Sequence, residues 1–265
     1  MDDQSLLEVL AEAAAAVRSA LDRLDDWRSA GSRPGQYRLD QIADVAALSV
    51  LHGAGFSVLS EESGLTRPSG GSAPKGAPMG NHVTTGASSG DGLMVVVDPV
   101  DGSTNASLGL PWFATSLCVL DGGGARTALV VNQATGVRFE AIRGGGARRD
   151  GHPIQPSGCR TISEAVIGIS GFPPSHPGWS QFRALGSAAL DLCAVAEGVL
   201  DGYLLVGGSW LHAWDYLGGM LVCSEAGAAV GELYGNDLVT RDDSLRSPVA
   251  AATPDLLEEL LLGAA

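Results

Sequence analysis

The sequence predicts an α+β fold, with helices packed in layers against mixed and antiparallel sheets. Three observations carry this prediction. Apolar residues recur every three or four positions near the N-terminus. A continuous apolar run at 93–97 is followed by short strand-like segments separated by glycine-containing turns. The last third of the chain alternates helix-like and strand-like segments, and strands that come first as a meander favour α+β layers over a doubly wound sheet.

The N-terminal segment is expected to form two helices and a strand. The first helix has one apolar stripe, with Ser5 as the predicted N-cap and Gly31 as the predicted stop. The second helix is predicted at 39–52 and a short strand at 56–60. Residues 65–92 are rich in Gly, Ser, Pro, Ala and Thr without periodicity, which predicts a long mobile surface loop. Such a loop is a tolerated insertion, a lid or a subunit contact.

The remaining elements begin with the apolar run at 93–97, which is typical of a strand buried on both faces. Further strands are predicted at about 113–121, 127–134, 137–143, 165–169, 202–206, 228–233 and 248–252. Glycine turns between the first three of these indicate an antiparallel meander, and Arg148-Arg149 is interpreted as a solvated turn. Further helices are predicted at 187–200, with Ser187 as N-cap, at 214–226 and at 254–262.

Length and composition favour a globular protein. The chain has 265 residues, of which 45% are hydrophobic and 17% charged, enough for one large domain or two packed halves. We predict a single domain over 1–265, with an N-terminal half at about 1–150 and a C-terminal half at about 151–265. No apolar run reaches the roughly 18 residues that span a bilayer. Since the acidic start is unlike a signal peptide, we expect no membrane partner and a cytoplasmic location.

The net charge of −14 makes a nucleic-acid partner unlikely on electrostatic grounds, so we predict none. The same charge would repel an anionic phosphate ester unless bound cations invert the local field. The cysteines show no C-x-x-C spacing, and those at 118, 193 and 223 lie in apolar runs, which predicts buried thiols.

Two carboxylates follow the buried strand at 93–97. Asp98 and Asp101 stand three residues apart, and Pro99 fixes φ and bends the chain, so both side chains can converge. Adjacent carboxylates repel and are costly to bury unpaired, a conflict that a divalent cation resolves. Oxygen ligands favour Mg²⁺, Mn²⁺ or Ca²⁺ over zinc. Asp-Pro or Asp-Gly alone is typical of an ordinary turn, but the full octapeptide 98–105 after a buried strand favours a metal site.

The residues after Asp101 suit a phosphate group. Gly102 lets the backbone approach a ligand closely. The N–H groups of Gly102, Ser103 and Thr104 can hold a phosphate, more so if they open a helix.

The octapeptide Asp98-Pro99-Val100-Asp101-Gly102-Ser103-Thr104-Asn105 resembles the signature of the inositol monophosphatase family of magnesium-dependent, lithium-sensitive phosphatases. Three further segments agree in the family's order: 60–64, 186–189, and 214–219 followed by 224–227. The resemblance spans nearly the whole chain. It implies a layered α/β/α/β/α sandwich of the sugar-phosphatase type, a homodimer and inhibition by lithium.

The resemblance also implies two Mg²⁺ sites. Glu62, Asp98 and the backbone carbonyl of Val100 would hold one ion, and Asp98, Asp101 and Asp215 the other, with Asp98 bridging. Metal ions in such pairs lie about 3.5–4 Å apart and clamp the attacking and leaving oxygens of an in-line displacement.

Roles in the reaction follow from the same resemblance. Glu62 and the Ser103 hydroxyl would orient and deprotonate the attacking water, and Asp101 would act with the second ion. The N–H groups of Gly102 and Ser103 would hold the phosphoryl oxygens. The alcohol part of the substrate would contact Gly186, Ser187 and Ala188.

The sequence departs from the family pattern in three places. Ser103 stands where the family usually has Thr. The stretch 32–37 lacks a carboxylate, which puts a third, loosely held metal in doubt, and Asp40 is interpreted as a helix-start residue. The stretch 206–213 lacks the Glu that binds an inositol hydroxyl, so Ser209, Trp210 and His212 become the candidates for substrate contact.

We therefore predict Mg²⁺-dependent hydrolysis of a small phosphate monoester, with inositol 1-phosphate as the first candidate. Histidinol phosphate and fructose 1,6-bisphosphate are alternatives within the family. A module that binds metal and a phosphorylated ligand without turnover is the alternative of another class. The aspartyl-phosphate phosphatases use an Asp-x-Asp motif, and the Asp-x-x-Asp spacing of Asp98 and Asp101 argues against them.

Overall fold

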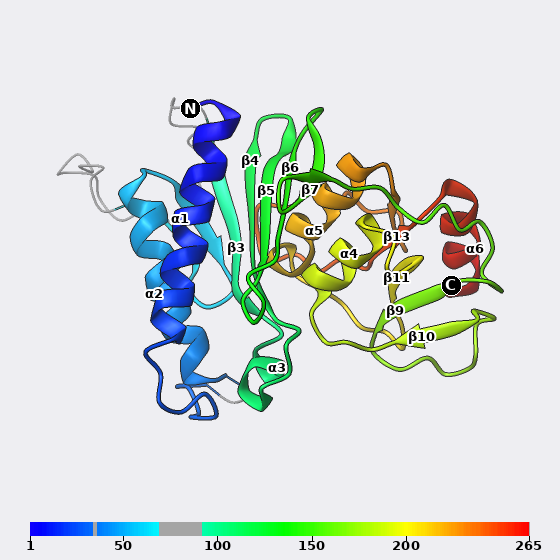
Figure 1. The fold of residues 1–265 in the computed structure, drawn as a ribbon, viewed down its shortest axis with the longest axis horizontal. Coiled ribbons are helices and arrows are strands. Elements are labelled where there is room, and N and C mark those ends of the chain that lie inside the picture. The colour runs from blue at the N-terminus through cyan, green and yellow to red at the C-terminus, as the bar shows by residue number, and fades with distance from the viewer. Residues whose placement is uncertain (34–35, 69–91, 265) are drawn as a thin grey trace, which may run out of the picture.

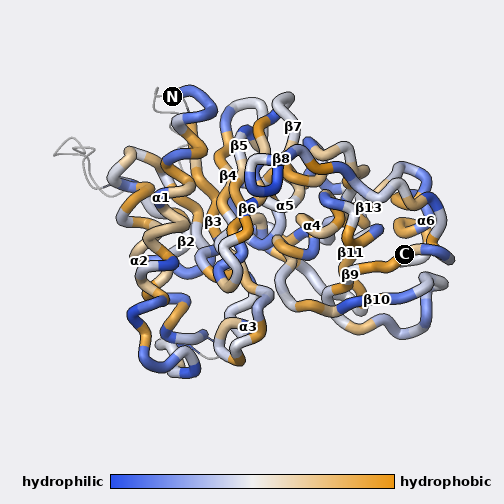
Figure 2. Tube along the Cα trace, in the orientation of Figure 1, coloured by the Kyte–Doolittle hydropathy of each residue, from blue (hydrophilic) through white to orange (hydrophobic). Residues whose placement is uncertain are grey.

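The computed structural model describes residues 1–33, 36–68 and 92–264, and it confirms the α+β class. Figure 1 shows five layers: helices α1 and α2, a large sheet, helices α4 and α5, a smaller sheet, and helix α6. This is the layered sandwich that the family resemblance implies. Hydrophobic residues are concentrated along the strands of both sheets (Figure 2).

The outer N-terminal layer consists of α1 (Asp3–Leu21) and α2 (Arg38–Gly53). The prediction that Ser5 caps α1 is wrong. Asp2 is the N-cap, and its carboxylate accepts a hydrogen bond of 2.8 Å from the backbone N–H of Ser5. A carboxylate suits this end of a helix, because it meets free N–H groups and the positive end of the dipole. The helix also ends before the predicted stop at Gly31, with Asp22 as its C-cap.

The large sheet has the strand order β2-β1-β3-β4-β5-β6-β7-β8. The strands with predicted counterparts are β1 (Ser57–Ser60), β3 (Met94–Asp101), β4 (Ala114–Asp121), β5 (Gly124–Asn132) and β6 (Arg138–Ile142). β1 pairs with β3 in parallel, and β3 to β6 form the predicted antiparallel meander.

Three short strands of this sheet were not predicted. β2 (Gly64–Thr66) occupies the start of the predicted 65–92 loop, and residues 69–91 of that loop lie outside the described residues. β7 (Gly146–Arg149) and β8 (His152–Pro153) extend the meander, so Arg148 and Arg149 lie in a strand and not in a turn. Charged residues are common in short strands near a sheet edge, where backbone pairing and not burial holds the strand.

The smaller sheet has the order β10-β9-β11-β13-β12. Four of its strands were predicted: β9 (Val166–Ser170), β11 (Gly202–Leu205), β12 (Ala229–Glu232) and β13 (Pro248–Ala251). The fifth, β10 (Gln181–Arg183), is an exposed edge strand without an alternating apolar pattern. Helix α6 (Pro254–Ala264) covers the outer face of this sheet (Figure 1). Among the described residues, no helix is long and apolar enough to cross a membrane.

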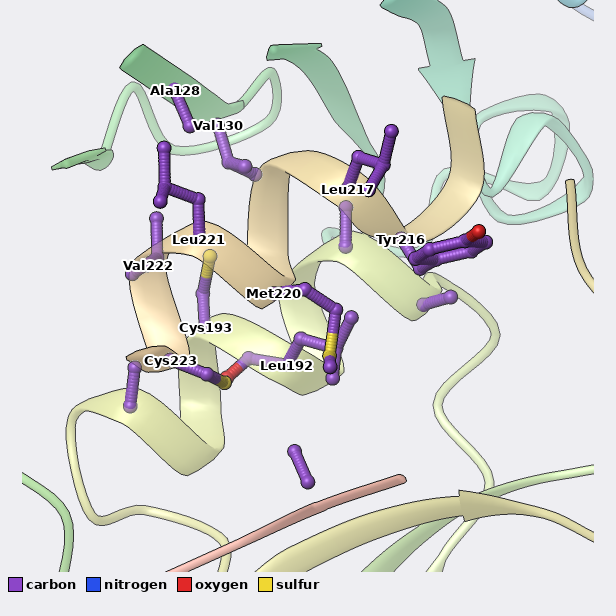
Figure 3. Close-up of a cluster of buried hydrophobic side chains, with 14 of the residues drawn as sticks. Ala128, Val130, Leu192, Cys193, Tyr216, Leu217, Met220, Leu221, Val222 and Cys223 are labelled. Carbon is purple, nitrogen blue, oxygen red and sulfur yellow. The ribbon is translucent and has the colours of Figure 1, made fainter. Parts of the chain in front are cut away.

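The central layer contains α4 (Ala188–Ala196) and α5 (Ala213–Ala226). Every residue of α4 is buried, and it ends before the predicted Leu200. Close packing of α5 at Gly218 and Gly219 is evident, because a Cβ atom on Gly219 would lie 2.7 Å from Cβ of Leu192. Figure 3 shows Leu192 and Cys193 of α4 facing α5.

The cysteines predicted to be buried thiols, Cys118, Cys193 and Cys223, are buried and free. Burial raises the pKa of Cys118 to about 12, so this thiol stays protonated. Glu225, near the end of α5, accepts hydrogen bonds from the backbone N–H groups of Gly144 (2.9 Å) and Gly146 (3.0 Å), which gives it a structural role.

Candidate active site

Strands β1 and β3 deliver acidic residues to the face of the large sheet that α4 and α5 cover. In β3, Val96 packs in the core beneath α4 and α5, whereas Val95 and Val97 pack beneath α1 and α2. Side chains alternate along a strand, so Asp98 continues the face of Val96. The pairing of β3 with β4 shifts register between Asp98 and Asp101, and such a bulge re-aims the side chains that follow it.

Asp98 is 2% exposed, and its Oδ1 atom accepts a hydrogen bond of 2.9 Å from the backbone N–H of Val100. Burial raises the pKa of Asp98 well above its usual value, and repulsion from Glu61, Asp101 and Asp215 adds to the effect. These residues come from three separate parts of the chain, so the fold brings their charges together.

Asp101 is held by the start of α4. Its Oδ2 atom accepts hydrogen bonds from the Ser187 hydroxyl (2.6 Å) and the Ala189 N–H group (2.7 Å). Burial raises the pKa of Asp101 to about 6 even though these donors stabilise the charged form. Ser187 is therefore the N-cap of α4 by position, but its hydroxyl serves Asp101 and not the helix.

Asp215 lies in the first turn of α5, where its Oδ2 atom accepts a hydrogen bond of 2.7 Å from the His212 N–H group. Desolvation raises the pKa of Asp215, with further contributions from the charges of Asp101 and Glu61. The residue thus caps its helix and also faces the acidic cluster.

The structure brings Glu61, and not Glu62, next to Asp98. The carboxylates of Glu61 and Asp98 lie close enough to share a proton, and the Glu61 N–H group donates to the Val97 carbonyl at 3.3 Å. The Glu62 carboxylate instead accepts hydrogen bonds from the side chains of Arg33 and Gln36. The structure thus places Glu61 in the acidic cluster, whereas Glu62, for which the ligand role was predicted, is bound by Arg33 and Gln36.

Strand alternation explains why Glu61, and not Glu62, lies beside Asp98. Leu59 of β1 packs in the core beneath α4 and α5, and Val58 packs beneath α1 and α2. Counting on in steps of two, Glu61 continues the face of Leu59, which is also the face of Asp98.

Asp40 is a site residue that the sequence interpretation missed. It does begin α2 as predicted, since its Oδ2 atom accepts a hydrogen bond of 2.9 Å from the Tyr37 N–H group. It is also 6% exposed, and its Oδ1 atom makes no well-formed hydrogen bond. Burial raises the pKa of Asp40 to about 6, while the nearby Ser103 hydroxyl favours the charged form.

Ser103 begins helix α3 (Ser103–Leu108), and Gly102 is its N-cap with a φ of 87°. These residues therefore do open a helix, which is the condition under which their N–H groups better suit a phosphate. Ser103 also lines a cavity of about 430 Å³, to which Arg33 and Gln36, between α1 and α2, and the start of α5 contribute. The residues around this cavity are Arg33, Gln36, Asp40, Glu61, Glu62, Ser103, His212, Trp214 and Asp215.

Comparisons with known proteins place this site in a family. The model of the inositol monophosphatase family matches residues 54–265. The chain belongs to the inositol monophosphatase family. All four motifs of the sequence resemblance lie inside the matched segment, whereas Arg33 and Asp40 precede it.

The relatives to which this chain is similar carry different names. The chain is 32% identical over 181 residues to Nus factor SuhB of Escherichia coli strain K12, in an alignment that covers 63% of this chain and 65% of the relative. It is 29% identical over 275 residues to a fructose-1,6-bisphosphatase/inositol-1-monophosphatase of Archaeoglobus fulgidus, with 98% of both chains covered. The alignment to the Escherichia coli SuhB protein thus spans just under two thirds of that relative.

Solved structures confirm the family fold. An extragenic suppressor from Pyrococcus furiosus superposes with a TM-score of 0.77 at 24% identity, covering 97% of this chain and 99% of the other. The suppressor protein SuhB from Bartonella henselae superposes with a TM-score of 0.75 at 25% identity, with 98% of both chains covered.

The residues predicted to contact the alcohol part of the substrate are placed differently in this family member. His212 lines the cavity, stacks on Trp214 with ring centroids 4.5 Å apart, and has its Nδ1 atom 3.0 Å from the Asp243 carbonyl. Ser187 and Ala188 are buried behind Asp101 and do not line the cavity, nor does Gly186.

The donor set suits a hard divalent cation. Among the described residues, no three His, Cys, Asp or Glu side chains already stand at metal-binding positions. Asp98, Asp101 and Asp215 each direct one oxygen to a protein N–H or hydroxyl group. Yet these clustered carboxylates have raised pKa values. Arg33, the only guanidinium among the described cavity residues, is paired with Glu62. Small side-chain rotations toward a cation would relieve the repulsion, and oxygen donors favour Mg²⁺.

Proposed function

We propose that this chain hydrolyses a small phosphate monoester with Mg²⁺. One observation carries the proposal: the carboxylates of Glu61, Asp98, Asp101 and Asp215 gather from the ends of β1 and β3 and the start of α5, and Glu61 and Asp215 of this cluster line the cavity. Family membership makes phosphatase chemistry the expected use of such a cluster.

Two ions would be shared among these groups. Glu61, Asp98 and the Val100 carbonyl would hold one, and Asp98, Asp101 and Asp215 the other. When bound, Mg²⁺ supplies charge neutralisation and Lewis-acid stabilisation of the phosphoryl and leaving oxygens. Arg33 and Gln36 hold Glu62 at the rim of the cavity, where it adds negative charge without joining this set.

Ser103 and Asp40 would orient the attacking water. The Ser103 hydroxyl and the buried Asp40 carboxylate both line the cavity, and this carboxylate is the group able to accept a proton through the hydroxyl. As the water oxygen bonds to phosphorus, the bond between phosphorus and the ester oxygen breaks, and the released alkoxide takes a proton from solvent. The backbone N–H groups of Gly102, Ser103 and Thr104 would hold the phosphoryl oxygens.

The alcohol part of the substrate would lie against His212 and Trp214. No carboxylate lies in the stretch 206–213 to bind hydroxyl groups, and the stacked pair supplies a flat wall in its place. Inositol 1-phosphate is the first substrate to test, with histidinol phosphate and fructose 1,6-bisphosphate as alternatives. The name of the Archaeoglobus relative covers both a bisphosphatase and a monophosphatase activity.

The deciding experiment measures phosphate release from these three esters with and without Mg²⁺. We expect release from at least one ester, dependent on Mg²⁺ and inhibited by millimolar lithium. Binding of an ester without release would favour the non-catalytic module, an alternative kept open by relatives named Nus factors.

Partners and assembly remain proposals. One buried cluster contains Cys118 of β4, Leu217 of α5 and Tyr203 of β11, so we infer a single domain with a core continuous between the sheets. A homodimer, a cytoplasmic location and the absence of a nucleic-acid partner are expected. Sedimentation would test the first, and gel shift with RNA and DNA the last.

A further inference from the structure

Behind the acidic cluster, the starts of α3 and α4 are joined by a closed ring of hydrogen bonds. We propose that Asp191 is a positioning residue that acts through Trp112 to fix Gly102 and Ser103 relative to Asp101. The inference rests on the proposed phosphatase function and concerns residues outside the cavity.

Asp191 is the only polar residue of α4 and is 0% exposed. Its Oδ1 atom accepts a hydrogen bond of 2.8 Å from the indole N–H group of Trp112, and its Oδ2 atom has no partner among the described residues. A buried carboxyl group with an unsatisfied oxygen costs stability. An apolar side chain would suit this helix better, so the hydrogen bond to Trp112 is the evident use of Asp191.

Trp112 is in turn hydrogen-bonded to α3. Its backbone carbonyl accepts a hydrogen bond of 2.7 Å from the side-chain amide of Asn105, which also donates to the Leu185 carbonyl at 2.7 Å. Asn105 is a buried residue of α3, so its amide ties that helix both to Trp112 and to the segment leading into α4.

The Trp112 carbonyl also lies beneath Gly102, together with the carbonyl of Gly186. A Cβ atom on Gly102 would lie 2.9 Å from the Gly186 carbonyl oxygen and 3.1 Å from that of Trp112. The backbone of Gly102 therefore packs closely against the Trp112 carbonyl, and we expect a shift of Trp112 to displace Gly102 and the adjoining Ser103.

The ring closes at Asp101. The Ser187 hydroxyl and the Ala189 N–H group, which hold Asp101, belong to the same turn of α4 that carries Asp191. Both ends of the Gly102–Ser103 segment are thus held, through Asp101 and through Trp112, by the first turn of α4. Loss of the Trp112–Asp191 bond would free one end while Asp101 stays in place.

Trp112→Phe tests the proposed role of the Trp112–Asp191 hydrogen bond, because it removes the indole N–H group and keeps an aromatic side chain at this position. We expect kcat to fall about tenfold while KM changes by less than about twofold, because misplacement of about an ångström has large effects on turnover. Asp191→Asn keeps an oxygen acceptor for the indole, so its kcat should stay within about twofold of wild type. Trp27→Phe is the matched control, because Trp27 takes no part in the hydrogen bonds that join α3 and α4. A kcat for Trp112→Phe within twofold of wild type, or an equal loss in Asp191→Asn, would overturn the proposal.

Hydrogen exchange followed by mass spectrometry separates this inference from the proposed function. In Mg²⁺-free protein, Trp112→Phe should speed exchange of the amides at 102–106 several-fold, with 213–226 unchanged and Asp191→Asn like wild type. If wild type releases no phosphate, the proposed function fails and this readout alone decides the positioning role. Unchanged exchange at 102–106 in Trp112→Phe would then refute it.

Discussion

The Glu61 carboxylate lies beside that of Asp98, close enough for the two to share a proton, although Glu61 follows β1 and Asp98 lies in β3. Its neighbour Glu62 is bound instead by Arg33 and Gln36. Two adjacent residues of one type thus have different surroundings, which makes them a matched pair for mutation.

We expect Glu61→Gln to lower kcat by at least about 100-fold, because it removes a carboxylate from the acidic cluster. Glu62→Gln should cost less than about tenfold, since it only weakens the contact with Arg33. Steady-state kinetics at saturating Mg²⁺ measures both. The reverse order of effects would restore Glu62 as the metal ligand.

Asp98→Asn should abolish turnover and leave the fold intact. The substitution removes the shared charge at the centre of the cluster, yet it also relieves repulsion with Glu61, Asp101 and Asp215. We therefore expect the melting temperature of the Mg²⁺-free variant to equal or exceed that of wild type. Nearly normal activity, or a sharp loss of stability without Mg²⁺, would contradict the bridging position assigned to Asp98.

Stability without Mg²⁺ should fall as pH rises. Burial raises the pKa of Asp101 from 3.8 to about 6. The folded state therefore binds more protons than the unfolded state between these values, and the free energy of unfolding decreases as pH rises through them. Mg²⁺ binds the charged form, so its stabilising effect should grow over the same range. Melting curves at pH 4.5 and 7.5, with Mg²⁺ or EDTA, test this; a metal-free protein more stable at pH 7.5 would oppose it.

Activity should depend on the ionisation of Asp40. Burial raises the pKa of its carboxyl group to about 6, so this base is charged above that pH and protonated below it. We expect kcat/KM to fall on the acid side of about pH 6, and Asp40→Asn to lose at least about 100-fold at pH 7.5. Asp44→Asn, a buried aspartate one turn along α2 that does not line the cavity, is the control.

Much of this arrangement could be predicted from the sequence. The spacing of apolar residues located most helices and strands, because buried faces impose their period on the chain. Short strands at or next to a sheet edge, such as β10 and β7, escaped detection, since backbone pairing holds them without an apolar pattern.

The site was harder to predict at the level of single residues. The motif positions of Asp98, Asp101 and Asp215 each offer a single acidic residue, and the fold brings these three residues together. Glu61 and Glu62 offered two candidates, and only the phase of β1 distinguishes them. Asp40 both caps the start of α2 and lines the cavity. From the sequence, the capping role alone is a sufficient explanation for an aspartate at this position.

The central layer predicts one further mutational effect, at Gly219. A Cβ atom there would lie 2.7 Å from Cβ of Leu192 and 2.9 Å from the Ala189 carbonyl oxygen, both in the helix that holds Asp101. Gly219→Ala should therefore lower the free energy of unfolding by about 1–3 kcal/mol, because α4 and α5 must move apart. Gly53→Ala, at the end of α2 with nothing within 4 Å of its Cβ position, should be neutral or slightly stabilising. Urea unfolding of both variants measures the difference, and equal stabilities would show that the two helices can separate at no cost.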